Sequence, residues 1–95
     1  MVCEVYDYRF SSETDMTSVE ELLLLAAMAA EGLHGRARMQ LDAAFICATA
    51  ARQAQVDAST EVGAAIARIF TALLSATIGE PAFKVERTVR EESKC

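Results

Sequence analysis

Two carboxylates and one arginine in the middle of the chain have the spacing to form a polar site. Asp42 belongs to residues 36–43 and Asp57 to residues 53–59, two runs in which apolar and polar residues alternate, and Arg52 lies between the runs. Paired carboxylates can share a proton or bind a metal ion. Because no further ligand accompanies them, we expect a solvated polar face without a metal or cofactor. A small-molecule site at Asp42, Arg52 and Asp57 is the alternative.

His34 and Cys47 are the other side chains with catalytic potential. His34 is the only histidine and lies between two glycines, where a helix is expected to end. A cation there satisfies the last carbonyl groups, whereas the helix dipole disfavours an anion. Cys47 falls on the helix-facing side of a predicted strand, where a thiol behaves as a small hydrophobic group. The sequence therefore predicts no catalytic residue, and an enzyme that uses His34, or Asp42 with Asp57, is the remaining alternative.

The size and charge of the chain limit what it can do. We expect a single α+β domain over residues 1–90, followed by a charged, disordered tail over residues 91–95. The net charge of −5 argues against partners such as nucleic acid or an anionic membrane surface, which require a basic face. The longest apolar run, residues 22–30, is less than half of the about 20 residues that a membrane span needs.

The cysteine pattern bears on the cellular compartment. The chain has three cysteines, Cys3, Cys47 and Cys95, without a CxxC spacing. With a single histidine they build neither a disulfide framework nor a zinc site. We therefore expect reduced thiols in a cytoplasmic protein.

The alternation between residues 36 and 59 is the strongest structural signal. A period of two places successive side chains on opposite faces, as in a half-buried strand. It predicts a hairpin with Ala50 and Ala51 at the tip and Phe45 opposite Val56. The apolar positions expected to share its buried face are Met39, Leu41, Ala43, Phe45, Cys47, Ala54, Val56 and Ala58. The rival interpretation is an all-α bundle in which residues 37–58 form one helix, because the region is rich in Ala.

The flanking elements complete the predicted fold. Residues 2–10 and 83–89 have the composition of strands, and helices are expected from Thr17 or Ser18 to Glu31 and from Ser59 or Thr60 to Gly79. The order strand, helix, strand, strand, helix, strand is the split βαβ pattern of the ferredoxin-like fold. We therefore expect an α+β domain with two helices on one face of a four-stranded antiparallel sheet, whose first and third strands are central.

Surplus apolar surface is the main functional signal. At 53%, the hydrophobic fraction is high for so small a chain. Leu24, Leu25 and Met28 fall outside the inward stripe of the first helix, and Tyr6, Tyr8 and Ile46 are expected on the sheet face opposite the helices. These six residues predict an interface with a second copy or with another protein. The expected function is a homo-oligomeric, in the simplest case dimeric, interaction module without catalysis; the alternative is a regulatory domain that binds a small ligand between subunits.

Overall fold

The computed structural model describes residues 2–91 and contains one sheet and three α-helices. The elements in chain order are β1 (Val2–Phe10), α1 (Met16–His34), α2 (Arg36–Asp42), β2 (Phe45–Ala48), β3 (Gln53–Asp57), α3 (Glu61–Thr77), the 3₁₀ turn η1 (Glu80–Ala82) and β4 (Phe83–Glu91). Within the described residues the sheet has four antiparallel strands in the order β2-β3-β1-β4. The predicted α+β class, with the first and third strands central, is confirmed.

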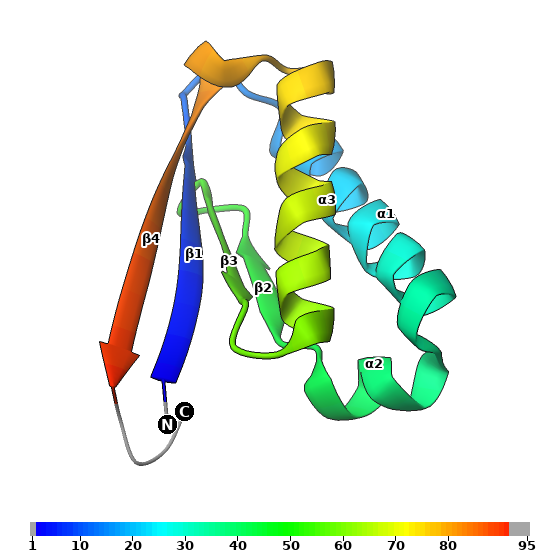
Figure 1. Cartoon of the computed structure of the whole chain (residues 1–95). Helices are drawn as coiled ribbons and strands as arrows, with labels where there is room; N and C mark the ends of the chain where they lie inside the picture. The colour runs from blue at the N-terminus through cyan, green and yellow to red at the C-terminus, as the bar shows by residue number, and fades with distance from the viewer. Residues whose placement is uncertain (1, 92–95) are drawn as a thin grey trace.

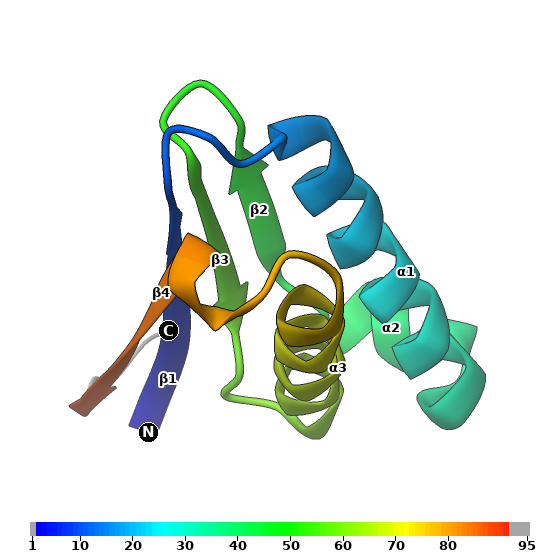
Figure 2. The ribbon, with the colours of Figure 1, turned by 90° about the horizontal axis from the view of Figure 1, so that it is seen from above.

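The molecule has two layers, because α1 and α3 both lie against one side of the sheet (Figures 1 and 2). β1 pairs with β4 over its whole length but with β3 only from Val5 to Arg9. Figure 2 shows that the two long helices lie beside β2 and β3. β4 extends away from them, and α3 lies between β4 and α1. The helix-facing side of β4 is therefore left partly uncovered.

The core fills the space between the two layers. Tyr8 is fully buried, with its ring edge-to-face against Phe70 at 4.8 Å between centroids. The apolar stripe of α1 and one side of α3 surround this pair. The largest other fully buried side chains are Val19, Leu23, Val56, Val62, Ile66 and Leu74. Core packing of this kind requires alternate positions of β1 and β3 to face the helices.

The first half of the predicted hairpin is wrong. Residues Arg36–Asp42 form the helix α2, and β2 consists only of Phe45–Ala48. Arg, Ala, Met, Gln and Leu are all strong helix formers, and seven residues are too few to separate a period of two from a helical one. Met39 and Ala43, four residues apart, both pack on the core, whereas Leu41 is exposed.

The second half of the hairpin follows the prediction. Phe45 pairs with Val56 and Cys47 with Ala54, which confirms the predicted register. The connection is the four-residue segment 49–52 rather than a tight two-residue turn. Its last residue, Arg52, has a φ of 55°. The rival all-α bundle is excluded, because residues 45–48 and 53–57 pair as strands.

Helix boundaries differ from the prediction by one turn or less. Asp15, not Thr17 or Ser18, caps α1, and its side chain accepts a hydrogen bond from the Thr17 amide at 3.0 Å. Thr60 caps α3 as expected. The last strand runs through Glu91, the first residue of the predicted tail, and residues 92–95 lie outside the described residues.

Candidate functional site

The predicted ligand site at Asp42, Arg52 and Asp57 is not assembled. Arg52 precedes β3 and Asp57 ends it, so the two are separated by about 17 Å of extended chain. Asp42 is the last residue of α2 rather than part of a strand, and its side chain lies outside what the structure describes. The three residues therefore do not form one site.

Arg52 and Asp57 instead make local structural contacts. The guanidinium of Arg52 donates to the carbonyl oxygens of Ser11 and Thr14, which ties the hairpin loop to the segment between β1 and α1. Asp57 Oδ1 accepts from the Ser59 amide at 2.9 Å, as expected for a residue that orders the turn into α3. Both polar groups are already used in holding loops.

The predicted interface residues of the sheet separate onto its two faces. Tyr8 is 0% exposed and belongs to the core, and Tyr6 lies on the same, helix-facing side. Ile46 is exposed on the opposite face, since it pairs with Gln55 while its neighbours in β2 pair with core residues. The expectation that Tyr6 and Tyr8 share an open face with Ile46 is wrong, because the even positions of β1 face the helices.

The open face of the sheet is mainly polar. Its residues alternate with the core positions of each strand, and they include Asp7, Arg9, Gln53, Gln55, Lys84, Glu86 and Thr88. Asp7 and Arg9 form a weak ion pair at 3.9 Å. A face of this composition is typical of one that stays in contact with water.

The outer face of α1, by contrast, is apolar and uncovered. Leu24, Leu25 and Met28 are 52%, 51% and 68% exposed, as their positions outside the inward stripe predict. At 100° per residue they form one stripe together with Ala29 and Gly32. The residues of α1 that face the core occupy the opposite side of the helix. α1 is therefore apolar on both of its sides, which is unusual for a helix at the surface.

His34 and Cys47 have the structural surroundings that the sequence suggests. His34 is half-buried in the last turn of α1. Cys47 is a free thiol on the helix-facing side of β2, and burial raises its pKa, which disfavours the nucleophilic thiolate. The expectation of reduced thiols is wrong for Cys3, which is disulfide-bonded. Cys95 lies outside the described residues.

A second surface feature is a groove between α3 and the β1–β4 pair, with a volume of about 570 Å³. Its walls are small or apolar: Ala58, Ala64, Ala67, Ala72 and Val85. Its polar side chains are Glu4, Tyr6, Arg68 and Thr71. The groove exists because β4 lies outside the area that the two helices cover.

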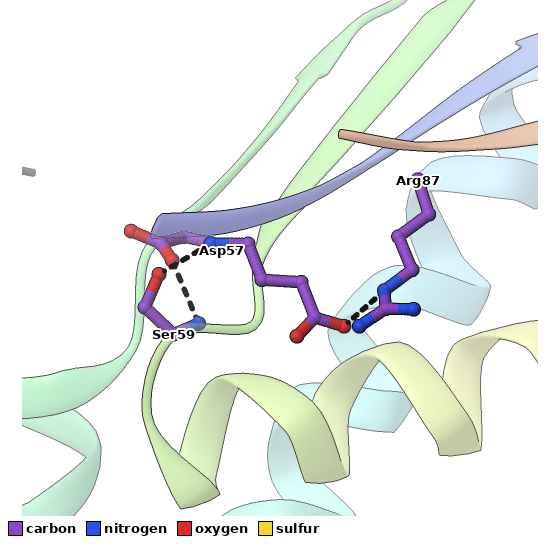
Figure 3. Close-up of polar contacts among 4 residues, drawn as sticks. Asp57, Ser59 and Arg87 are labelled. Atoms are coloured by element: carbon purple, nitrogen blue, oxygen red, sulfur yellow. Dashed lines mark hydrogen bonds and ion pairs between the residues drawn. The ribbon is translucent and has the colours of Figure 1, made fainter. Parts of the chain in front are cut away.

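Glu4 is the centre of the polar contacts beside this groove. Its carboxylate accepts from Arg87 Nε at 2.8 Å, and its backbone amide donates to Ser59 Oγ at 2.9 Å. Figure 3 shows the Arg87 side chain pointing from the strands toward α3, where the dashed line marks its bond to Glu4, and it shows the bond between Asp57 and Ser59 in the turn before α3. The hydrogen bond from Arg87, and a second one from Tyr6, lower the pKa of Glu4. The same hydrogen bond to the Glu4 carboxylate raises the pKa of Tyr6.

Sequence reasoning missed this cluster, although a signal was present. Glu4 is a charged residue among the apolar and aromatic even positions of β1, and Arg87 interrupts the series Phe83, Val85 and Val89 in β4. Two opposite charges that each break an apolar alternation are candidates for a pair.

Three further observations concern metal sites, membrane spans and similarity to known proteins. Among residues 2–91, no group of three or more His, Cys, Asp or Glu side chains is placed to hold a metal ion. No helix in this range has both the length and the apolar character needed to cross a membrane. Comparisons with protein-family models, with curated proteins and with solved structures find no match for this chain.

Proposed function

We propose that this chain is a non-catalytic interaction module that forms a homodimer through the outer face of α1. The observation that carries the proposal is the continuous exposure of Leu24, Leu25 and Met28 on that face. Contiguous apolar surface on a soluble domain marks an interaction site more often than isolated exposed residues do. The polar open face of the sheet favours the helix, rather than the sheet, as the contact surface.

The distribution of residues along α1 supports a second copy as the partner. In an antiparallel pair of α1 helices with Met28 on the two-fold axis, Leu24 of each copy lies opposite Gly32 of the other. The large residue then meets one without a side chain, around which there is open space. A two-fold interface requires one patch that is complementary to itself, and the sizes of the residues in this stripe meet that requirement.

The size of the stripe sets the expected affinity. α1 has 19 residues and is therefore about 28 Å long. One helix pair of this length buries less than the about 1,200 Å² of total surface found in standard stable interfaces. We therefore expect a reversible dimer with a dissociation constant in the micromolar range.

Sedimentation equilibrium at tens of micromolar protein tests this proposal. We expect a concentration-dependent dimer for the wild type and a monomer for the double variant Leu25→Glu, Met28→Glu. The control is Ile46→Glu, which places one negative charge on an exposed apolar residue of the sheet. A wild type that sediments as a monomer, or a dimer that Ile46→Glu dissociates and the α1 variant does not, would refute the α1 interface.

We also propose that the fold is ferredoxin-like. The strand order, with β1 and β3 in the centre, and the two long helices on one side of the sheet support this assignment. A fold of this kind carries many unrelated functions, so the assignment adds nothing to the choice of function.

A cytoplasmic location remains a prediction from the sequence. The disulfide at Cys3 weighs against it, because disulfides are rare in reducing compartments. Alkylation of the protein at the moment of cell lysis, followed by a count of its free thiols, distinguishes a reducing compartment from an oxidising one. Three alkylated cysteines are expected for a cytoplasmic protein.

A further inference from the structure

We propose that the groove between α3 and the β1–β4 pair binds a small organic carboxylate with an apolar body, held by Arg68 at its rim, with Arg87 beside the groove at Glu4. This site is separate from the proposed dimer interface. In Figure 2, α1 and β4 lie on opposite sides of α3, and the groove is on the side of β4.

The shape and lining of the groove fit a small molecule. Its volume of about 570 Å³ falls within the range of about 300–1,000 Å³ that is usual for ligand pockets. Four alanines and Val85 provide an apolar wall without long side chains that would fill the space. Polar groups come from few residues, which is also typical of such pockets.

The charges beside the groove select an anion. Arg68 lines the groove, and Arg87, which is bonded to the groove residue Glu4, lies beside it; the charges of both arginines lower the pKa of Glu4. Two guanidinium groups and one carboxylate leave one positive charge, in a protein whose overall charge is −5. A monoanion neutralises that charge, whereas the second charge of a phosphate monoester would face the Glu4 carboxylate.

The hydrogen-bond donors needed for a carboxylate are present. Arg87 forms its ion pair with Glu4 through Nε, one of the five N–H donors of its guanidinium. Arg68 is exposed at the rim of the groove. Guanidinium groups bind carboxylates with two parallel hydrogen bonds, which makes arginine suited to this role. The ring of Tyr6 contributes to the same wall.

Titration of three probes into isotope-labelled protein, followed by amide chemical shifts, tests the proposal. The first probe, 4-phenylbutyrate, combines a carboxylate with an apolar body. The second, 4-phenylbutylammonium, has the same apolar body with a positive charge. The third, inorganic phosphate, is an anion without an apolar body. We expect saturable shifts at Tyr6, Ala67 and Val85 with 4-phenylbutyrate only. Binding of the ammonium probe with equal affinity, or of phosphate with equal affinity, would overturn the proposal.

Variants distinguish binding in the groove from nonspecific binding. Arg68→Gln should weaken 4-phenylbutyrate binding at least about tenfold, because it removes the guanidinium at the rim. Arg9→Gln, a matched change on the opposite sheet face, should leave the affinity unchanged. Ala72→Leu narrows the groove at an exposed helical position and should also reduce binding. Unchanged affinity in Arg68→Gln refutes the site, and the monomeric Leu25→Glu, Met28→Glu variant should bind as the wild type does.

Discussion

Glu4 and Arg87 form an ion pair across β1 and β4, with 2.8 Å between Glu4 Oε1 and Arg87 Nε. Each is a charged residue on the helix-facing side of its strand, where its neighbours are apolar or aromatic. The pair lies where the helices leave β4 uncovered, so both charges retain access to water. The ion pair therefore stands where the alternation of each strand predicts two apolar residues facing the core.

The pH dependence of this pair follows from the lowered pKa of Glu4, whose ordinary value is 4.5. Because the folded-state pKa is the lower one, the pair stabilises the fold at pH values above 4.5. That contribution is lost as the pH falls through the folded-state pKa. Arg87→Gln should therefore lower the urea midpoint slightly at neutral pH, with the difference disappearing in strong acid. The control Lys84→Gln changes the opposite side of β4, and an equal pH-dependent difference there would contradict the assignment.

Gly63 is required by the turn that precedes α3. A Cβ on Gly63 would overlap the carbonyl oxygen of Asp57 and lie 3.2 Å from Thr60 Oγ1. Gly63→Ala should therefore destabilise the protein by about 1–3 kcal/mol, as overpacking of a tight site does.

Gly32 provides the matched control for this change. It lies within α1, and a Cβ there meets nothing within 4 Å. Gly32 lies in the proposed dimer interface, so Gly32→Ala is measured in the monomeric Leu25→Glu, Met28→Glu variant, where it should stabilise the fold by up to about 1 kcal/mol through helix propensity alone. Chemical denaturation of the two variants measures both effects. Equal changes in the two would show that the close approach at Gly63 relaxes without cost.

The sequence predicts the elements that are long or strongly patterned. The order of the four strands and two long helices and the register at Phe45 and Val56 can all be derived from alternation and capping residues. These features depend on patterns that many residues share, so one exception does not change the result.

The predictions from sequence are wrong where the local structure depends on only a few residues. Over residues 36–42 a period of two and helix propensity conflict, and the packing of Met39 on the core favours the helix. The sequence does not show which side of β1 faces the helices, because both sides of the strand carry apolar residues. Tyr8 turns inward since its hydroxyl finds partners on α3, and this tertiary contact is invisible in sequence. The groove depends on how far the helices extend over the sheet, which no local pattern specifies.

The buried hydroxyl of Tyr8 contributes to stability through α3. It lies 2.8 Å from Thr71 Oγ1 and donates to the carbonyl oxygen of Ala67 at 3.2 Å. Tyr8→Phe should therefore cost about 1 kcal/mol, since the hydroxyl is satisfied in the folded state. The loss should be smaller when Thr71 is already replaced by Val, because one of the partners is then absent.

A double-mutant cycle of Tyr8→Phe and Thr71→Val, measured by thermal unfolding, quantifies this coupling. Thr71 Oγ1 also donates to the Ala67 carbonyl at 2.7 Å, so the Thr71 variant alone loses that bond as well. Strictly additive losses would indicate that Tyr8 and Thr71 do not interact in solution.

Arg52 combines an unfavourable backbone with favourable side-chain contacts. Its φ of 55° lies in the left-handed region, which costs residues other than glycine about 1–2 kcal/mol. Its guanidinium donates to the Ser11 carbonyl from Nε at 2.9 Å and also bonds to Thr14. Arg52→Ala keeps the backbone cost and loses the bonds, whereas Arg52→Gly loses the bonds but also removes the cost. We therefore expect Arg52→Gly to be more stable than Arg52→Ala by about 1 kcal/mol in urea denaturation. Equal stability of the two variants would mean that the loop leaves the left-handed conformation once the guanidinium is gone, and that the contacts to Ser11 and Thr14 hold the backbone there.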